Sequence, residues 1–146
     1  MKAIVKIFAV AALIAVSTFA MAAEGHGSKS AKVNLYTADF ALEHYVAVTT
    51  AGESAGVVQL FTEDFNQKIQ ASNAQSNSRS AVVKLLKKQK GEKLNCTVST
   101  DILEESADYM VAKVTLKFEH FTKTDLVTLE RVGDDWKVSK SINSYK

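Results

Sequence analysis

The strongest constraint on the fold is the alternation of apolar and polar residues in the C-terminal half of the chain. The apolar positions on one face are Leu94, Cys96, Val98, Thr100 and Ile102 in one segment, and Met110, Ala112, Val114, Leu116 and Phe118 in the next. Successive side chains of a strand point to opposite faces of a sheet, so this period of two predicts two half-buried strands.

Two further strands are expected near the C-terminus. Residues 126–132 form one of them, Gly133-Asp134-Asp135 signals a tight turn, and Trp136, Val138 and Ile142 mark the last strand. The C-terminal half is therefore predicted to be a meander of antiparallel hairpins, in which Trp136 anchors the sheet to the helices.

The N-terminal half alternates helical and extended patterns. Apolar residues at helical spacing predict helices over residues 35–50 and 53–62, and the alternation over residues 65–71 predicts a short strand. Residues 72–78 are expected to form a polar loop, and Asn77 or Ser78 can cap a third helix that Gly91 ends. Helices followed by strands indicate an α+β domain, in which helices cover one face of a sheet.

Three sequence stretches resemble the nuclear-transport-factor-2-like superfamily, which is also called SnoaL-like. They are Ala41-Leu42-Glu43-His44-Tyr45, Leu60-Phe61-Thr62-Glu63-Asp64-Phe65 and Gly133-Asp134-Asp135-Trp136-Lys137-Val138. The resemblance implies a cone-shaped α+β fold with three N-terminal helices packed on a strongly curved antiparallel sheet, a pocket at the wide end and a homodimer. Within this superfamily the chain resembles the secreted bacterial members of the lumazine-binding type.

The first residues are typical of a secretory signal peptide. Lys2 and Lys6 precede an apolar run over residues 7–19, and Ala20-Met21-Ala22 is a small-x-small cleavage site. We expect a signal peptide over residues 1–22, a flexible lead-in over residues 23–32 and one domain over residues 33–146. The mature protein is then periplasmic or secreted and no longer attached to a membrane. Cys96 is its only cysteine, so no disulfide within the chain is expected.

Charge limits the class of partner. The chain has 18 basic and 16 acidic residues, and loss of Lys2 and Lys6 leaves 16 of each. A formally neutral domain lacks the overall positive field that attracts nucleic acids, so no nucleic-acid partner is expected. The cluster Lys84, Lys87, Lys88, Lys90 and Lys93 suits the negative end of the third helix, or alternatively an anionic partner.

The strand that holds Met110 to Phe118 has a second face of mixed polarity. Its residues are Tyr109, Val111, Lys113, Thr115 and Lys117. Such a face can be exposed to solvent or can join two subunits.

No catalytic residue, metal site or cofactor is predicted. Neither of the segments 94–102 and 110–118 has an acidic residue in phase with its apolar face, and no phosphate loop or metal-ligand spacing occurs. His120 continues the apolar phase of its strand, and Tyr45 lies on the packed face of the first helix. The expected pocket residues are Tyr45, Met110, Phe118, His120 and Trp136.

The sequence therefore favours an exported, non-catalytic protein that binds a small apolar or amphipathic molecule. One alternative is an isomerase- or dehydratase-like enzyme, which requires at least one deeply buried acid with a raised pKa beside Tyr45 or His120. The other is a homodimeric interaction module, in which side chains fill the cone and leave no usable cavity.

Overall fold

The computed structural model describes residues 32–146. The predicted signal peptide and all but the last residue of the lead-in lie outside the described residues. Within residues 32–146, none of the helices has the length and hydropathy needed to cross a membrane.

Three helices form on the N-terminal side of the domain: α1 (Ala38–Thr50), α2 (Val57–Leu60) and α3 (Arg79–Lys88). Thr37 caps α1 by accepting a hydrogen bond from the backbone of Phe40 at 3.2 Å, and Ser78 caps α3 as predicted. The helix expected over residues 53–62 is a single turn. It stops because Phe61 is extended and begins the first strand, where it pairs with Val138.

Six strands make one sheet in the order β2-β1-β6-β5-β4-β3. Their bounds are β1 (Phe61–Gln70), β2 (Gln75–Ser78), β3 (Thr97–Glu105), β4 (Tyr109–Lys117), β5 (Thr122–Val132) and β6 (Asp135–Tyr145). Two details differ from the prediction. The sheet is mixed, because β1 runs parallel to β6, and the end of the expected loop 72–78 is strand β2, which pairs with β1 in a hairpin.

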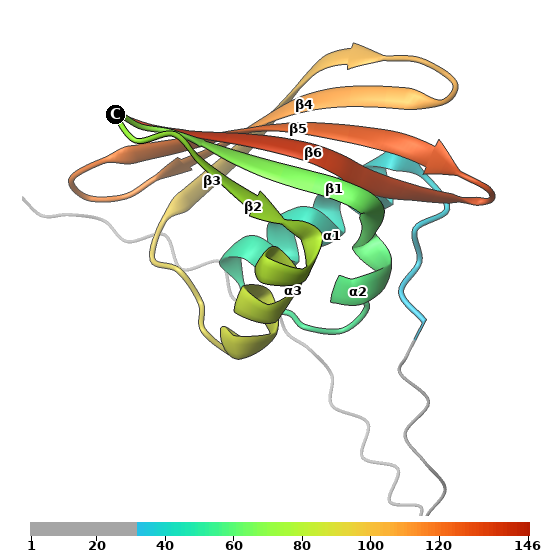
Figure 1. Ribbon diagram of the computed structural model, residues 1–146, viewed down its shortest axis with the longest axis horizontal. Helices are drawn as coiled ribbons and strands as arrows, with labels where there is room; N and C mark the ends of the chain where they lie inside the picture. The colour runs from blue at the N-terminus through green and yellow to red at the C-terminus, as the bar shows by residue number, and fades with distance from the viewer. Residues whose placement is uncertain (1–31) are drawn as a thin grey trace, which may run out of the picture.

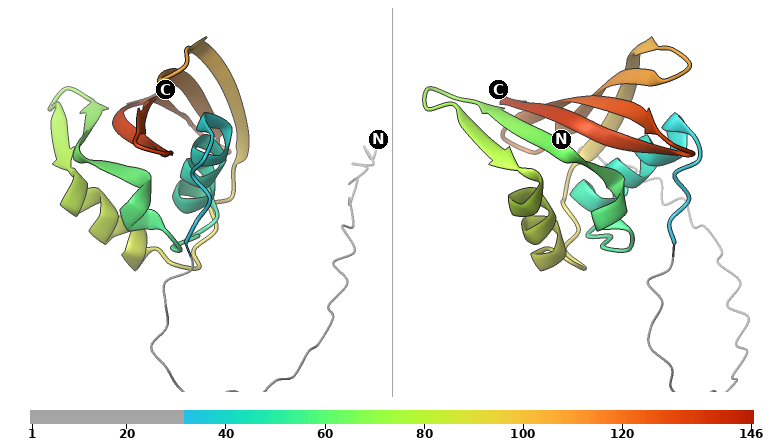
Figure 2. Two further views of the ribbon diagram at one scale, coloured as in Figure 1. Left: turned by 90° about the vertical axis from the view of Figure 1, so that its right-hand side faces the viewer. Right: turned by 45° about the vertical axis from the view of Figure 1, so that its right-hand side comes forward.

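The helices all lie on one face of the sheet, and the sheet curls around α1 (Figures 1 and 2). The predicted α+β cone is therefore confirmed. The β4–β5 turn and the C-terminus lie at one end of this cone, and the β5–β6 turn lies at the other end (Figure 1).

The core lies between α1 and the concave face of the sheet. The side chains of Met110, Ala112, Val114 and Leu116 on β4 are completely buried, as their alternation predicts. Strand β3 behaves differently, because it is an edge strand and α1 packs mainly on β4, β5 and β6. Only Cys96 and Val98 of its predicted inner face pack against the core, and Leu94, Thr100 and Ile102 are exposed.

Candidate functional site

A pocket of about 420 Å³ opens between α1, α3 and the sheet, at the end of the cone that holds the β4–β5 turn and the C-terminus. Most of its lining is apolar or aromatic, and the polar members are mainly amides and hydroxyls. The lining residues are Tyr45, Thr49, Phe61, Gln67, Ile69, Asn77, Val82, Leu85, Leu86, Gln89, Leu94, Phe118, Phe121, Lys123, Asn143 and Tyr145.

A buried carboxylate lies behind this lining. Asp125 on β5 has no exposed surface and shares the inward face of the strand with Val127 and Leu129. Tyr45 Oη donates a hydrogen bond to Asp125 Oδ2 at 3.1 Å, and Lys123 Nζ lies 3.0 Å from the same oxygen. A buried carboxylate costs much less free energy when a cation and a hydroxyl donor both contact it. This Lys123–Asp125–Tyr45 cluster is thus a polar centre inside an apolar core.

The neighbouring strand β6 extends the polar centre. Asn143 pairs in register with Asp125, and both it and Ser141 are buried. Within residues 32–146, Asp125 Oδ1 and Asn143 Oδ1 have no hydrogen-bond partner. A buried oxygen without a partner is destabilising, so each of these two acceptors suits a hydrogen-bond donor such as a water molecule.

The Tyr45 hydroxyl is held in its neutral form. Burial raises its pKa well above the usual value of 10.0, and the negative charge of Asp125 and the hydrogen bond to it raise the pKa further. At physiological pH Tyr45 is therefore a hydrogen-bond donor and not a base.

Aromatic side chains form the rim of the pocket. Phe118 and Phe121 stack with their ring centroids 4.4 Å apart, and Tyr145 lies 6.3 Å from Phe121. Phe121 and Tyr145 are 42% and 50% exposed. Exposed aromatic rings beside a pocket favour an apolar occupant.

The structure places only two of the five expected pocket residues in this lining, Tyr45 and Phe118. Met110 is completely buried in the core and Trp136, which is also buried, donates its backbone N–H to Leu35. His120 lies in the turn after β4 with its side chain 84% exposed, because the strand and its alternation end at Lys117. Contact of any of these residues with a ligand remains a prediction.

The sequence pattern does not single out Asp125, because the apolar alternation predicts a strand that begins only at Leu126. Strand β5 begins at Thr122, and with those four extra residues Lys123 and Asp125 fall in phase with Val127. The alternation of inward and outward residues extends unbroken to Lys123, but its first two inward residues are the charged pair Lys123 and Asp125 instead of apolar residues.

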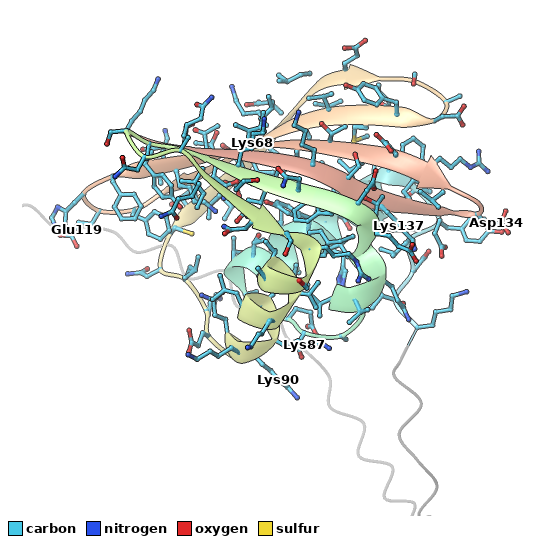
Figure 3. All side chains as sticks on the ribbon, in the orientation of Figure 1. Lys68, Lys87, Lys90, Glu119, Asp134 and Lys137 are labelled. Atoms are coloured by element: carbon cyan, nitrogen blue, oxygen red, sulfur yellow. The ribbon has the colours of Figure 1, made fainter. Side chains whose placement is uncertain are left out.

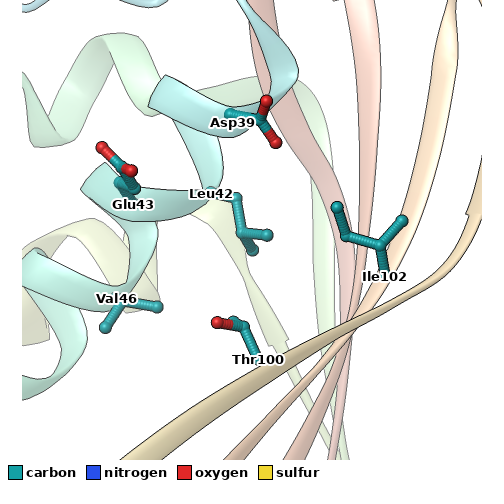
Figure 4. Close-up of a pocket in the computed structure, with 6 residues that line it drawn as sticks. All are labelled: Asp39, Leu42, Glu43, Val46, Thr100 and Ile102. Carbon is teal, nitrogen blue, oxygen red and sulfur yellow. The ribbon is translucent and has the colours of Figure 1, made fainter.

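A second hollow of about 420 Å³ lies between α1 and β3 (Figure 4). Asp39, Leu42, Glu43 and Val46 of α1 face Thr100 and Ile102 of β3 across it. Of these six residues only Leu42 is buried, and none is a buried polar group. The cone pocket, with its buried polar centre, is therefore the better candidate for a specific site. Among residues 32–146, no group of three His, Cys, Asp or Glu side chains is placed to hold a metal ion.

No protein-family model matches the sequence, and no curated protein matches it. Solved structures do match. A nuclear-transport-factor-2-like protein of unknown function from Silicibacter pomeroyi is 15% identical, covers 73% of this chain and 88% of its own, and has a TM-score of 0.58. A protein of unknown function from Pectobacterium atrosepticum is also 15% identical, with coverage of 77% and 90% and a TM-score of 0.60.

The chain has the nuclear-transport-factor-2-like fold. A third protein with this fold, from Parabacteroides distasonis, is provisionally named a ketosteroid isomerase. It is 11% identical, with coverage of 80% and 92% and a TM-score of 0.56. At these identities the comparison establishes the fold alone, because proteins of one fold carry many functions.

Proposed function

We propose that this protein binds a small amphipathic molecule in the cone pocket and does not transform it. One observation carries the proposal: a pocket of about 420 Å³ with a largely apolar lining has a single buried polar centre in its inner wall. Ligand sites in proteins commonly measure ~300–1,000 Å³ and combine apolar walls with a few fixed polar groups. Such a pocket also argues against the interaction-module alternative, which expects a filled cone.

The arrangement of the polar centre favours binding over catalysis. Asp125 Oδ2 already contacts Lys123 and Tyr45, and Tyr45 stays protonated. The lining described within residues 32–146 includes neither a carboxylate nor a histidine. General acid–base chemistry needs a group that can reach the substrate and exchange a proton with it, and the nearest candidate, Asp125, has no exposed surface and does not line the pocket.

The enzyme alternative keeps one specific observation in its favour. Asp125 beside Tyr45 has the position of the buried acid that an isomerase- or dehydratase-like enzyme requires. The two functions differ in what happens to the bound molecule, since an enzyme releases a changed molecule and a binding protein releases the same one.

We further propose that the protein acts outside the cytoplasm, after cleavage behind Ala22, and as a homodimer. The support for export is the sequence pattern of residues 1–22. Assignment to the secreted, lumazine-binding type rests on the sequence resemblance and remains a prediction.

Native mass spectrometry of the mature protein from its own host tests the binding function. We expect a retained small-molecule mass that disappears in Leu85→Trp, because Leu85 lines the pocket and is 51% exposed, so that a larger ring there obstructs the opening. Val58→Trp is the matched control, since Val58 is 42% exposed on α2 and does not line this pocket. Recovery of a chemically altered molecule after incubation would support the enzyme instead.

A neutral fluorescent dye, N-phenyl-1-naphthylamine, gives a second readout that needs no natural ligand. Leu85→Trp is expected to weaken dye binding by about tenfold, and Val58→Trp to leave it unchanged. Equal binding by the wild type and both variants would place the dye elsewhere and contradict the proposal.

A further inference from the structure

We propose that the molecule held in the cone pocket is an amphipathic anion whose carboxylate binds Lys123. This inference rests on the proposed function and adds the chemical class of the ligand. It follows from the charge of the lining, from the lysines on the adjoining helix and from the aromatic rim.

Lys123 is the one formally charged side chain among the lining residues described within 32–146. Its side chain is 18% exposed, and its Nζ lies 3.0 Å from Asp125 Oδ2. An ammonium group has three N–H donors, so two remain for a second acceptor. Asp125 is fully buried and does not line the pocket, so a molecule in the pocket meets the ammonium group before it meets the carboxylate.

Helix α3 and the residues that follow it, which form one wall of the pocket, carry positive charge on their exposed surface. Leu85, Leu86 and Gln89 of this segment line the pocket. The exposed lysines of the segment are Lys84, Lys87, Lys88, Lys90 and Lys93. Within residues 32–146 none of these five lysines forms an ion pair, and Lys87 and Lys90 project away from the sheet (Figure 3). Glu92 offsets only one of the five charges. Clustered charge of one sign raises the local concentration of the opposite ion and speeds its encounter with the site.

The remainder of the lining suits a hydrocarbon or aromatic body. Ile69, Leu85 and Phe118 line the pocket, and Phe121 and Tyr145 extend the apolar surface to the rim. A small inorganic anion would leave these apolar side chains without a partner. A carboxylate at the end of an apolar body satisfies both the ammonium group and the apolar walls.

Octanoate and 1-octanol test the inference, because they share one chain and differ in the charged head group. Isothermal titration calorimetry at pH 7 and constant ionic strength is expected to show octanoate binding about tenfold more tightly than octanol. Lys123→Met should reduce that preference to within about twofold. Lys113→Met is the matched control, because Lys113 is paired with Asp101 on another part of the sheet, 3.3 Å from Asp101 Oδ2, and does not line the pocket.

Lys123→Met leaves Asp125 without its cation, so the double variant Lys123→Met/Asp125→Asn serves as a second test in which no unpaired charge is buried. Loss of the octanoate preference in both variants supports the inference. Equal binding of octanoate and octanol to the wild type overturns the anionic class and leaves the binding function intact. A preference that survives both variants but disappears in Lys84→Gln/Lys87→Gln/Lys88→Gln overturns the role of Lys123. Failure of octanoate, octanol and the neutral dye alike overturns the proposed function as well.

Discussion

At the scale of single residues, the hydrogen bond between Tyr45 and Asp125 joins α1 to the sheet inside the core. Tyr45→Phe removes the hydroxyl donor from a carboxylate that has no exposed surface. We expect the free energy of unfolding to fall by ~1–3 kcal/mol, since a buried charged acceptor loses a partner that water cannot easily replace. Urea denaturation measures the change. Tyr109→Phe, at an exposed position on β4, should cost less than about 0.5 kcal/mol.

The same tyrosine gives a pH dependence with a defined sign. The pKa of Tyr45 is raised in the folded state, mainly by burial, so the folded protein keeps this proton at a pH at which the unfolded chain has lost it. The contribution of Tyr45 to the free energy of unfolding is fully present below the pKa of the unfolded chain, near 10. It is lost as the pH rises from there toward the pKa of the folded protein. The slope approaches about −1.4 kcal/mol per pH unit.

Unfolding measured between pH 9 and about pH 11 checks this expectation. Tyr45→Phe should flatten the decline by the contribution of one proton, and Tyr109→Phe should not. An identical slope in the wild type and Tyr45→Phe would mean that Tyr45 ionises alike in both states.

At the scale of elements, two loops are held together at Gly52. Its carbonyl accepts from the backbone of Gly91 at 2.9 Å, and a Cβ built on Gly52 would lie 2.5 Å from the backbone nitrogen of Glu92. The contact ties the end of α1 to the segment that leads from α3 into β3, which forms part of the pocket wall.

Gly52→Ala and Gly133→Ala separate backbone strain from crowding. Both glycines have positive φ, 69° and 64°, but nothing lies within 4 Å of a Cβ on Gly133. Gly133→Ala should cost ~1–2 kcal/mol for the left-handed conformation alone. Gly52→Ala should cost a further ~1–3 kcal/mol, because the Glu92 backbone must move. Thermal or urea unfolding of both variants measures the difference, and equal costs would contradict the crowding.

Elements with long periodic patterns were predictable from the sequence, and those defined by pairing were not. Strand β4 was predicted within a residue because its inner face is uniformly apolar. Strand β2 is polar and mostly exposed, so only its pairing with β1 reveals it. The parallel pairing of β1 with β6 joins segments distant in the sequence, and no local pattern encodes it. For the site, the helical pattern predicted that Tyr45 faces inward, whereas Asp125 emerged only from the full length of β5.

At the scale of the whole molecule, the outer face of the sheet is the surface that no helix covers (Figures 1 and 2). One row of residues in register crosses five strands on this face. It consists of Asp101, Lys113, Leu126, Ile142 and Lys68. Leu126 and Ile142 are half-buried and stand between charged neighbours, which resembles the apolar centre and polar rim of a moderately sized interface.

We therefore expect the predicted homodimer to form through this outer face. Leu126→Glu puts a like charge at the centre of both partners, so we expect it to convert the dimer to a monomer in size-exclusion chromatography with light scattering. The domain should remain folded, because Leu126 points away from the core that Asp125 and Val127 enter. Ile102→Glu is the control, since Ile102 is exposed beside the α1–β3 hollow. A dimer that withstands Leu126→Glu but dissociates in Ile102→Glu would move the interface to the β3 edge. The cone pocket opens on the helical side of the sheet, so either dimer leaves ligand binding unchanged.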